Sequence, residues 1–193
     1  MPKRTVKRFR YESEMERTPL SPALERRLRK VALDRAPGEL AEWHAATDDV
    51  ERFYAAPKAS MAAYMLCDRP LALKLAQEGL FLAPSFRDNW NYGNAIHYGH
   101  TVLGLLALQD DKLAQAVAEL NESGATPGSP QLDSFGPSMH LARDLLRRGE
   151  HQAVLHYLQQ CRRFWKMGTR WLDIWEKKVS RGAMPTFFMQ LYR

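Results

Sequence analysis

The segment from Asp133 to Trp165 constrains the fold most, because it predicts two amphipathic helices joined by one tight turn at Gly149. Apolar residues recur at helical spacing on each side of that glycine: Leu141, Leu145 and Leu146 before it, and Val154, Leu155, Leu158 and Cys161 after it. Helices that each carry one apolar face cannot bury those faces as an isolated pair, so they need similar pairs on either side. The segment therefore predicts an all-α fold of stacked helix pairs.

The same periodicity, punctuated by proline and glycine, predicts seven further helices. We expect them at residues 21–36, 38–56, 58–67, 71–82, 89–108, 112–121 and 169–180. Proline removes a backbone donor and restricts the residue before it, which places breaks at Pro37-Gly38 and at Pro57. The chain is thus expected to form about nine helices in antiparallel pairs. Residues 184–193 are rich in aromatic side chains and should pack back on the last helix.

Charge is concentrated at the start of the chain. Residues 1–30 contain ten Lys or Arg against four Glu, which accounts for the whole formal net charge of +6. Residues 1–19 show no periodicity, so we expect a flexible basic arm there and a single helical-repeat domain over residues 20–193. A basic segment can bind the phosphates of nucleic acid. The residues that would make such contacts are Lys3, Arg4, Lys7, Arg8, Arg10, Arg26, Arg27, Arg29 and Lys30.

Cysteine content and hydropathy bear on the compartment. The two cysteines, Cys67 and Cys161, both lie in apolar helical stretches, so we expect buried, reduced thiols rather than a disulfide. No charged start followed by an apolar run opens the chain, and no apolar run is long enough to cross a bilayer. We therefore expect a cytoplasmic protein without a membrane partner.

A recurring spacing points to a known repeat. The tetratricopeptide pattern has W-x2-L-G-x2-Y in its first helix and A-x3-F in its second. The matches here are His100-x2-Leu103-Gly104-x2-Ala107 followed by Ala116-x3-Leu120, Leu141-Ala142-x2-Leu145 followed by Val154-x3-Leu158, and Ala76-x3-Leu80. The chain from about residue 58 to residue 165 thus resembles a tetratricopeptide-like helical repeat. The stretch from Asn94 to Gly104, with SPQLDSFGP and CRRFW, also resembles a group of uncharacterised bacterial proteins, which implies no particular activity.

The helix predicted at residues 89–108 carries an uncharged polar and aromatic face. In helical repeats the first helix of each pair lines a concave surface that binds peptides. We therefore predict a groove that holds a protein or peptide, in an adaptor or immunity-type role. The alternative is that the same side chains connect neighbouring helices. The candidate residues are Trp90, Asn91, Asn94, His97, Tyr98 and Thr101, with Arg143 on the first helix of the next pair.

Enzymatic and metal-binding motifs are not evident. His97 and His100 have a ligand-like spacing, but they point in different directions on the helix and no HExxH or His-Cys cluster accompanies them. No activated Ser or Cys motif and no phosphate-binding glycine loop occurs. We expect neither a metal nor a cofactor and predict a non-catalytic protein, with an enzyme that lacks a recognisable motif as the third alternative after nucleic-acid binding. Trp171 and Trp175, four residues apart, are expected in the core.

Overall fold

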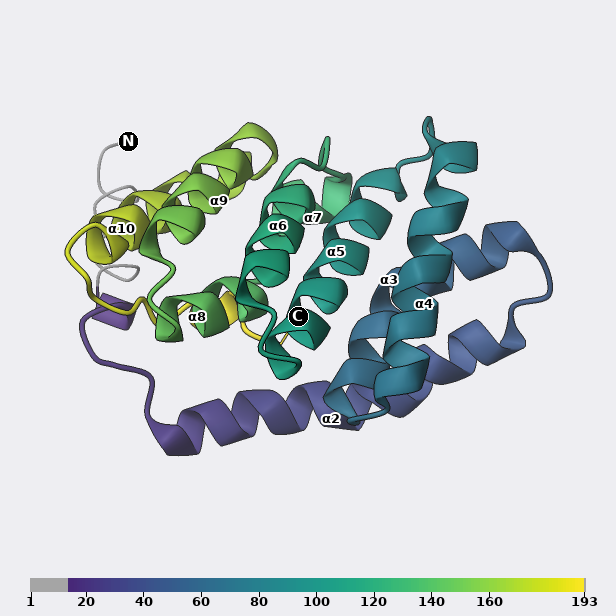
Figure 1. Cartoon of the computed structure of the whole chain (residues 1–193), viewed down its shortest axis with the longest axis horizontal. Helices are drawn as coiled ribbons and strands as arrows, with labels where there is room; N and C mark the ends of the chain where they lie inside the picture. Colours follow the sequence, from purple (N-terminus) through teal and green to yellow (C-terminus); the bar gives the residue numbers. More distant parts are fainter. Residues whose placement is uncertain (1–13, 193) are drawn as a thin grey trace, which may run out of the picture.

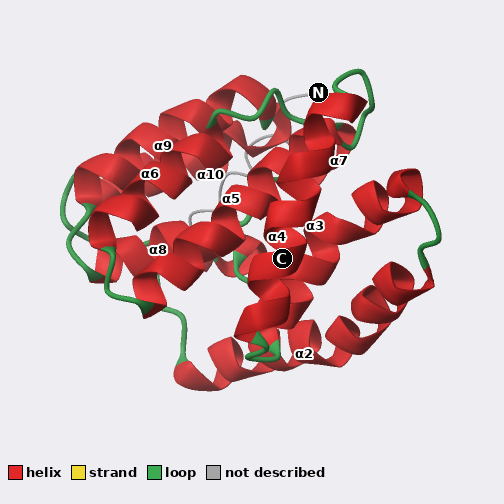
Figure 2. Ribbon diagram, turned by 45° about the vertical axis from the view of Figure 1, so that its right-hand side comes forward, coloured by secondary structure: helices red, strands yellow, loops and turns green. Residues whose placement is uncertain are grey.

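The computed structural model describes residues 14–192, and every regular element within this range is a helix (Figures 1 and 2). The all-α prediction is therefore confirmed for these residues. Between residues 14 and 192 the structure gives the bounds of nine α-helices: α2 (Pro22–Ala45), α3 (Asp49–Met65), α4 (Arg69–Leu82), α5 (Tyr92–Gln109), α6 (Leu113–Gly124), α7 (Pro130–Phe135), α8 (His140–Arg147), α9 (His151–Phe164) and α10 (Thr169–Val179). Short 3₁₀ helices follow at η1 (Ala83–Phe86), η2 (Lys166–Gly168) and η3 (Phe188–Gln190).

Helices close in sequence pack side by side. Helix α3 packs against α2, α4 and α5, helix α5 against α6, and helix α9 against both α6 and α10. Figure 1 shows the shorter helices arranged across the molecule, with the long helix α2 running along one edge of the array. This edge position allows α2 to flank a surface formed by several other helices.

Two predicted helix breaks were wrong, because Pro37 lies inside α2 and Pro57 lies inside α3. The chain instead turns at residues 46–48, where the Asp48 side chain accepts a hydrogen bond from the Glu51 amide at 2.8 Å. This N-cap satisfies one of the backbone donors left unpaired at a helix start. A proline within a helix removes only one backbone bond, and packing on both sides maintains the helix through it. The first three predicted helices are therefore two.

Helix α7 is not among the helices predicted from the sequence, because at six residues it is too short to show a helical repeat of apolar residues. Ser129 caps α7 by accepting a hydrogen bond from the Leu132 amide at 3.0 Å, and Pro130 occupies the first turn. The helix ends at Gly136, whose φ of 80° suits glycine. A side chain at this position would also collide with the Trp165 ring. Helix α7 is thereby held beside η2.

The C-terminal residues return to the core, as expected. Phe187 is fully buried, with its ring centroid 4.9 Å from that of Trp175. Trp175 is itself buried, as predicted, whereas Trp171, whose ring centroid lies 5.8 Å from that of Trp175, is only partly buried against the core. The Met139 amide donates to the carbonyl of Gln190 at 2.8 Å, which ties the tail to the start of α8.

The buried carboxylate of Glu16 ties down the start of the described chain. It accepts hydrogen bonds from Trp175 Nε1 at 2.8 Å and from the Thr186 hydroxyl at 2.6 Å, and it pairs with Lys178 Nζ at 2.8 Å. A flexible arm was expected to extend through residue 19, but Glu16 is held in the interior, where these three partners stabilise its carboxylate. Residues 1–13 lie outside the described part of the chain.

The two cysteines are both free thiols, in different environments. Cys161 is buried as predicted. Cys67 is exposed, and its predicted burial was wrong. It follows the end of α3 in a turn with a φ of 62°, which directs the chain away from the apolar face of that helix.

Candidate functional site

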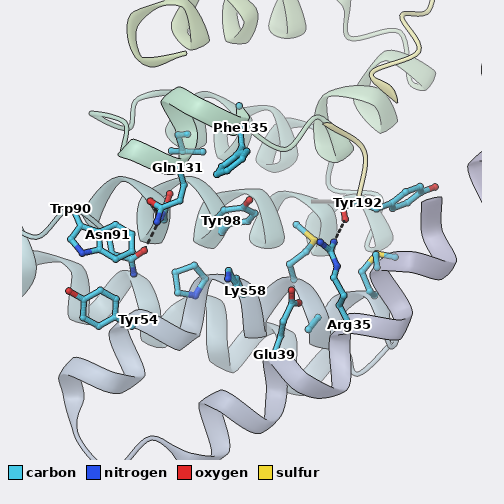
Figure 3. Close-up of a pocket in the computed structure, with 18 residues that line it drawn as sticks. Arg35, Glu39, Tyr54, Lys58, Trp90, Asn91, Tyr98, Gln131, Phe135 and Tyr192 are labelled. Carbon is cyan, nitrogen blue, oxygen red and sulfur yellow. Dashed lines mark hydrogen bonds between the residues drawn. The ribbon is translucent and has the colours of Figure 1, made fainter. Parts of the chain in front are cut away.

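A cleft of about 460 Å³ lies beside α5. Helices α2 and α3 form one side of it, helix α7 forms the opposite side, and Tyr192 of the C-terminal tail lies at one end (Figure 3). Four of the seven predicted groove residues line this cleft: Trp90, Asn91, Asn94 and Tyr98. Its volume is in the range of sites that bind small ligands or a few side chains of a peptide.

One end of the cleft is aromatic. The rings of Tyr54 and Trp90 lie with centroids 5.4 Å apart, and Asn89 Nδ2 donates to the Tyr54 hydroxyl at 2.7 Å. Trp90 is 48% exposed, and Phe135 on α7 is 58% exposed. Large aromatic side chains left in solvent provide contact area at little conformational cost to a partner.

The inner wall of the cleft is apolar. Met61 and Met65 on α3 are almost fully buried, as is Leu132 on α7. Unbranched methionine side chains can adjust to differently shaped partners, which is why they are frequent at adaptable binding surfaces. The aromatic end and this wall together form one continuous apolar lining.

The other end of the cleft is charged. Arg35 and Glu39 project from α2, and Lys58 projects from α3 (Figure 3). Arg35 Nη2 donates to the main-chain carbonyl of Tyr192 at 3.3 Å. Burial raises the pKa of Glu39, while the nearby charges of Arg35 and Lys58 partly offset that increase.

Asn91 compensates for the proline inside α3. Pro57 has no N–H, so the carbonyl of Phe53, four residues earlier, has no donor within the helix. Asn91 Nδ2 donates to this carbonyl at 3.1 Å, and both residues are buried. The Asn91 amide therefore satisfies a backbone acceptor that would otherwise be unpaired in the interior.

Asn94 extends the same network to α7. Its Nδ2 donates to Asn91 Oδ1 at 2.8 Å and to Gln131 Oε1 at 3.2 Å, and its Oδ1 accepts from the Ser129 hydroxyl at 2.6 Å. Both amide hydrogens of Asn94 are thus used by the chain itself. The two asparagines connect α3, α5 and α7, so at these positions the cleft wall is built by internal contacts.

His97 and Thr101 do not reach the cleft. His97 is fully buried, and its Nε2 accepts from the Ser138 amide at 2.9 Å. Its Nδ1 must then carry the proton and donate to the Ser123 carbonyl at 3.2 Å. Burial lowers the pKa of His97 to about 4. Thr101 is also buried, and its hydroxyl donates to the carbonyl of His97 at 2.7 Å.

Arg143 lies in a separate buried network. Its Nη1 donates to Glu25 Oε1 at 2.6 Å and to the Tyr192 hydroxyl at 3.2 Å, and its Nε donates to Asp144 at 3.3 Å. The Tyr192 hydroxyl in turn donates to Glu25 at 2.9 Å. These contacts join α8, α2 and the tail, so the structure does not bring Arg143 into the groove predicted for it.

The predicted nucleic-acid contacts are only partly described. Arg26, Arg27, Arg29 and Lys30 lie on α2 and are exposed. Lys30 Nζ is engaged with Asp34 at 2.7 Å. The remaining predicted contacts, Lys3, Arg4, Lys7, Arg8 and Arg10, lie outside the described residues.

The sequence reasoning missed the other residues that line the cleft, including Arg35, Glu39, Tyr54, Lys58 and Phe135. Tyr54 lies at helical spacing in the helix predicted at residues 38–56, and Phe135 lies in the segment from Asp133 to Trp165 that was predicted to form a helix pair. Proline and serine before α7 were a usable signal for that helix. No local signal, however, places α7 opposite α3.

Within residues 14–192, no helix is both long enough and apolar enough to span a lipid bilayer. In the same range, no three His, Cys, Asp or Glu side chains converge in a way that would hold a metal ion.

Comparisons with protein-family models, with curated proteins and with solved structures found no match for this chain.

Proposed function

We propose that this chain is a non-catalytic helical-repeat protein that binds a peptide or an extended protein segment in the cleft between α3, α5 and α7. The observation that carries the proposal is the exposure of Trp90, Tyr54 and Phe135 around a single apolar cleft. Isolated exposed apolar residues are ordinary, whereas several aromatic rings around one concavity are typical of binding sites.

The proposed architecture is a tetratricopeptide-like array with α3 and α4, α5 and α6, and α8 and α9 as its successive helix pairs. In such arrays the first helix of each pair lines the binding surface. The cleft residues on α3 and α5 fit this assignment. In this proposal the protein acts as an adaptor or immunity-type protein in the cytoplasm.

The nature of the lining favours a peptide. Asn91 and Asn94 are engaged by the chain itself, so most of the remaining contact area is aromatic and aliphatic. A row of aromatic and aliphatic side chains suits a peptide that presents its own apolar side chains at intervals. The partner is therefore expected to insert large apolar side chains between Trp90 and Phe135.

Selection from a library of displayed random peptides tests this proposal. Wild-type protein should enrich peptides with aromatic or large aliphatic residues. A Trp90→Ala plus Phe135→Ala variant should bind the enriched peptides about tenfold more weakly or worse, because buried aromatic contacts dominate peptide affinity. Urea unfolding should establish that the variant remains folded.

Phe81 provides the matched control, because it is 82% exposed and lies outside the cleft. The Phe81→Ala variant should bind the enriched peptides as the wild type does. Equal loss in both variants, or a selection that yields no shared pattern, would refute the cleft as a peptide site.

The alternative function is nucleic-acid binding through the exposed cations of α2. It predicts affinity that falls steeply with added salt, because phosphate contacts release bound counterions. A charge reversal of Arg26 and Arg27 should then weaken binding to duplex DNA and leave peptide binding unchanged. Peptide binding together with no DNA binding at low salt would exclude this alternative.

A further inference from the structure

We infer that the peptide bound in the cleft carries an Asp or Glu side chain next to its apolar anchor. This inference rests on the proposed function and specifies the partner's chemistry. It is drawn from the charged end of the cleft, where two cations and one carboxyl group line the same space (Figure 3).

The two cations of the cleft are not neutralised by the chain's own carboxylates. Among the described residues, neither Lys58 nor Arg35 forms an ion pair within 4.0 Å. Arg35 engages only a neutral acceptor, the Tyr192 carbonyl. Lys58 is exposed and lies between the aromatic end and the Arg35 end of the cleft. An acidic side chain of a bound peptide can therefore reach a cation that no carboxylate of the described residues holds within ion-pair distance.

Glu39 does not form an ion pair with either cation. It is the single carboxylate that lines the cleft within residues 14–192, and its oxygens lie beyond ion-pair distance of both cations. Desolvation raises its pKa, while the charges of Arg35 and Lys58 lower it. Two cations and one carboxylate give the lining a formal charge of +1, which favours an anionic group on the partner.

The C-terminal tail shows how a chain segment can lie at this end. The Tyr192 carbonyl accepts a hydrogen bond from Arg35 Nη2, so a side chain of the cleft already binds a main-chain group there. A peptide that continues from this point toward Trp90 would pass Lys58 before it reaches the aromatic rings (Figure 3). This order places the acidic residue between Tyr192 and the apolar anchor.

The test uses the peptides selected by the wild-type protein, synthesised with an amidated C-terminus so that all carboxylates belong to side chains. Each is compared with a version in which Asp and Glu are replaced by Asn and Gln. The neutral version should bind wild-type protein about tenfold more weakly, because it lacks the ion pair in a partly desolvated site. Added salt should weaken the acidic peptide and leave the neutral one unchanged.

Lys58→Glu should weaken binding of the acidic peptide about tenfold and leave the neutral peptide at its wild-type affinity. Lys177→Glu on α10 makes the same charge change at an exposed site outside the cleft and should alter neither affinity. Glu39→Gln should retain or tighten acidic-peptide binding. Thermal unfolding of each variant establishes that it is folded.

The outcomes separate the two levels of the proposal. Selected peptides without Asp or Glu, or equal affinities for the acidic and neutral versions, would overturn the inference while the peptide-binding function stands. Failure of every peptide to bind would reject the proposed function and this inference with it.

Discussion

Replacing Asn91 by alanine should destabilise the fold, because it removes the hydrogen-bond donor of the Phe53 carbonyl on α3. The Phe53 carbonyl has no helical donor because Pro57 lacks an N–H, and Asn91 Nδ2 is the donor it receives at 3.1 Å. An unsatisfied buried acceptor costs about 1–3 kcal/mol, and the bond from Asn94 to Asn91 adds about 1 kcal/mol. We therefore expect Asn91→Ala to lower the free energy of unfolding by about 2–4 kcal/mol.

A double-mutant cycle with Pro57→Ala isolates the proposed cause. Alanine at position 57 supplies the missing backbone N–H, so the Phe53 carbonyl no longer depends on Asn91. In that background Asn91→Ala should cost only about 1 kcal/mol, which leaves a coupling energy of about 1–3 kcal/mol between the two positions.

Equilibrium unfolding in urea, with circular dichroism at helical wavelengths, measures all four corners of the cycle. Asn91→Asp is an informative companion, because it keeps the shape but places a carboxylate oxygen against the Phe53 carbonyl. It should be at least as destabilising as alanine. An Asn91→Ala effect of equal size in both backgrounds would refute the assignment of Asn91 as the partner of the freed carbonyl.

Three further perturbations have defined outcomes. His97 has a folded pKa of about 4 against 6.5 in the unfolded chain, so the unfolded state gains protons first as the pH falls and stability declines between those values. From pH 7 to pH 5 His97 should account for a loss of about 2 kcal/mol in the free energy of unfolding, and His97→Gln should reduce the total loss by that amount. Burial also lowers the pKa of His140 to about 4, so a similar loss should remain in the variant. A His97→Gln variant with the wild-type pH slope in urea unfolding would contradict this account. Glu16→Ala should destabilise by about 3 kcal/mol or more, because Lys178 and the Trp175 indole lose a buried partner; an unchanged melting temperature would argue against this anchor. Gly93→Ala should disrupt the packing of α5, because the added Cβ would lie 1.8 Å from the Gly128 carbonyl oxygen. Faster amide hydrogen exchange in α5 would show this disruption, and exchange rates equal to those of the wild type would contradict it.

Much of the helical content could be predicted because it depends on local pattern. Leu145 and Leu158 repeat at helical spacing with their neighbours and are fully buried, as the amphipathic pair required. The errors arose where a local breaker competes with long-range packing. Local sequence rules place the end of a helix at Pro57, yet α3 continues through it. Asn91, 34 positions later in the chain, donates a hydrogen bond to the carbonyl that the proline leaves unpaired.

The candidate site was less predictable than the helices. The face from Trp90 to Thr101 was correctly identified as uncharged and polar, but helical spacing could not decide which of its members meet solvent. Trp90 is partly exposed, whereas His97 is fully buried and hydrogen-bonded to Ser123 and to Ser138. That difference depends on which segments cover each position, and those segments come from more than 25 residues away.

The sequence by itself determined that this chain is helical and which residues could form its apolar faces, because helix periodicity and capping act over a few residues. Only the tertiary structure decided that Tyr54, Trp90 and Phe135 line one cleft and that Lys58 lies within it beyond ion-pair distance of every carboxylate in residues 14–192. These side chains belong to separate segments, and their proximity follows from how α3, α5 and α7 pack. Such packing minimises exposed apolar surface over the whole molecule, so no single stretch of sequence encodes it.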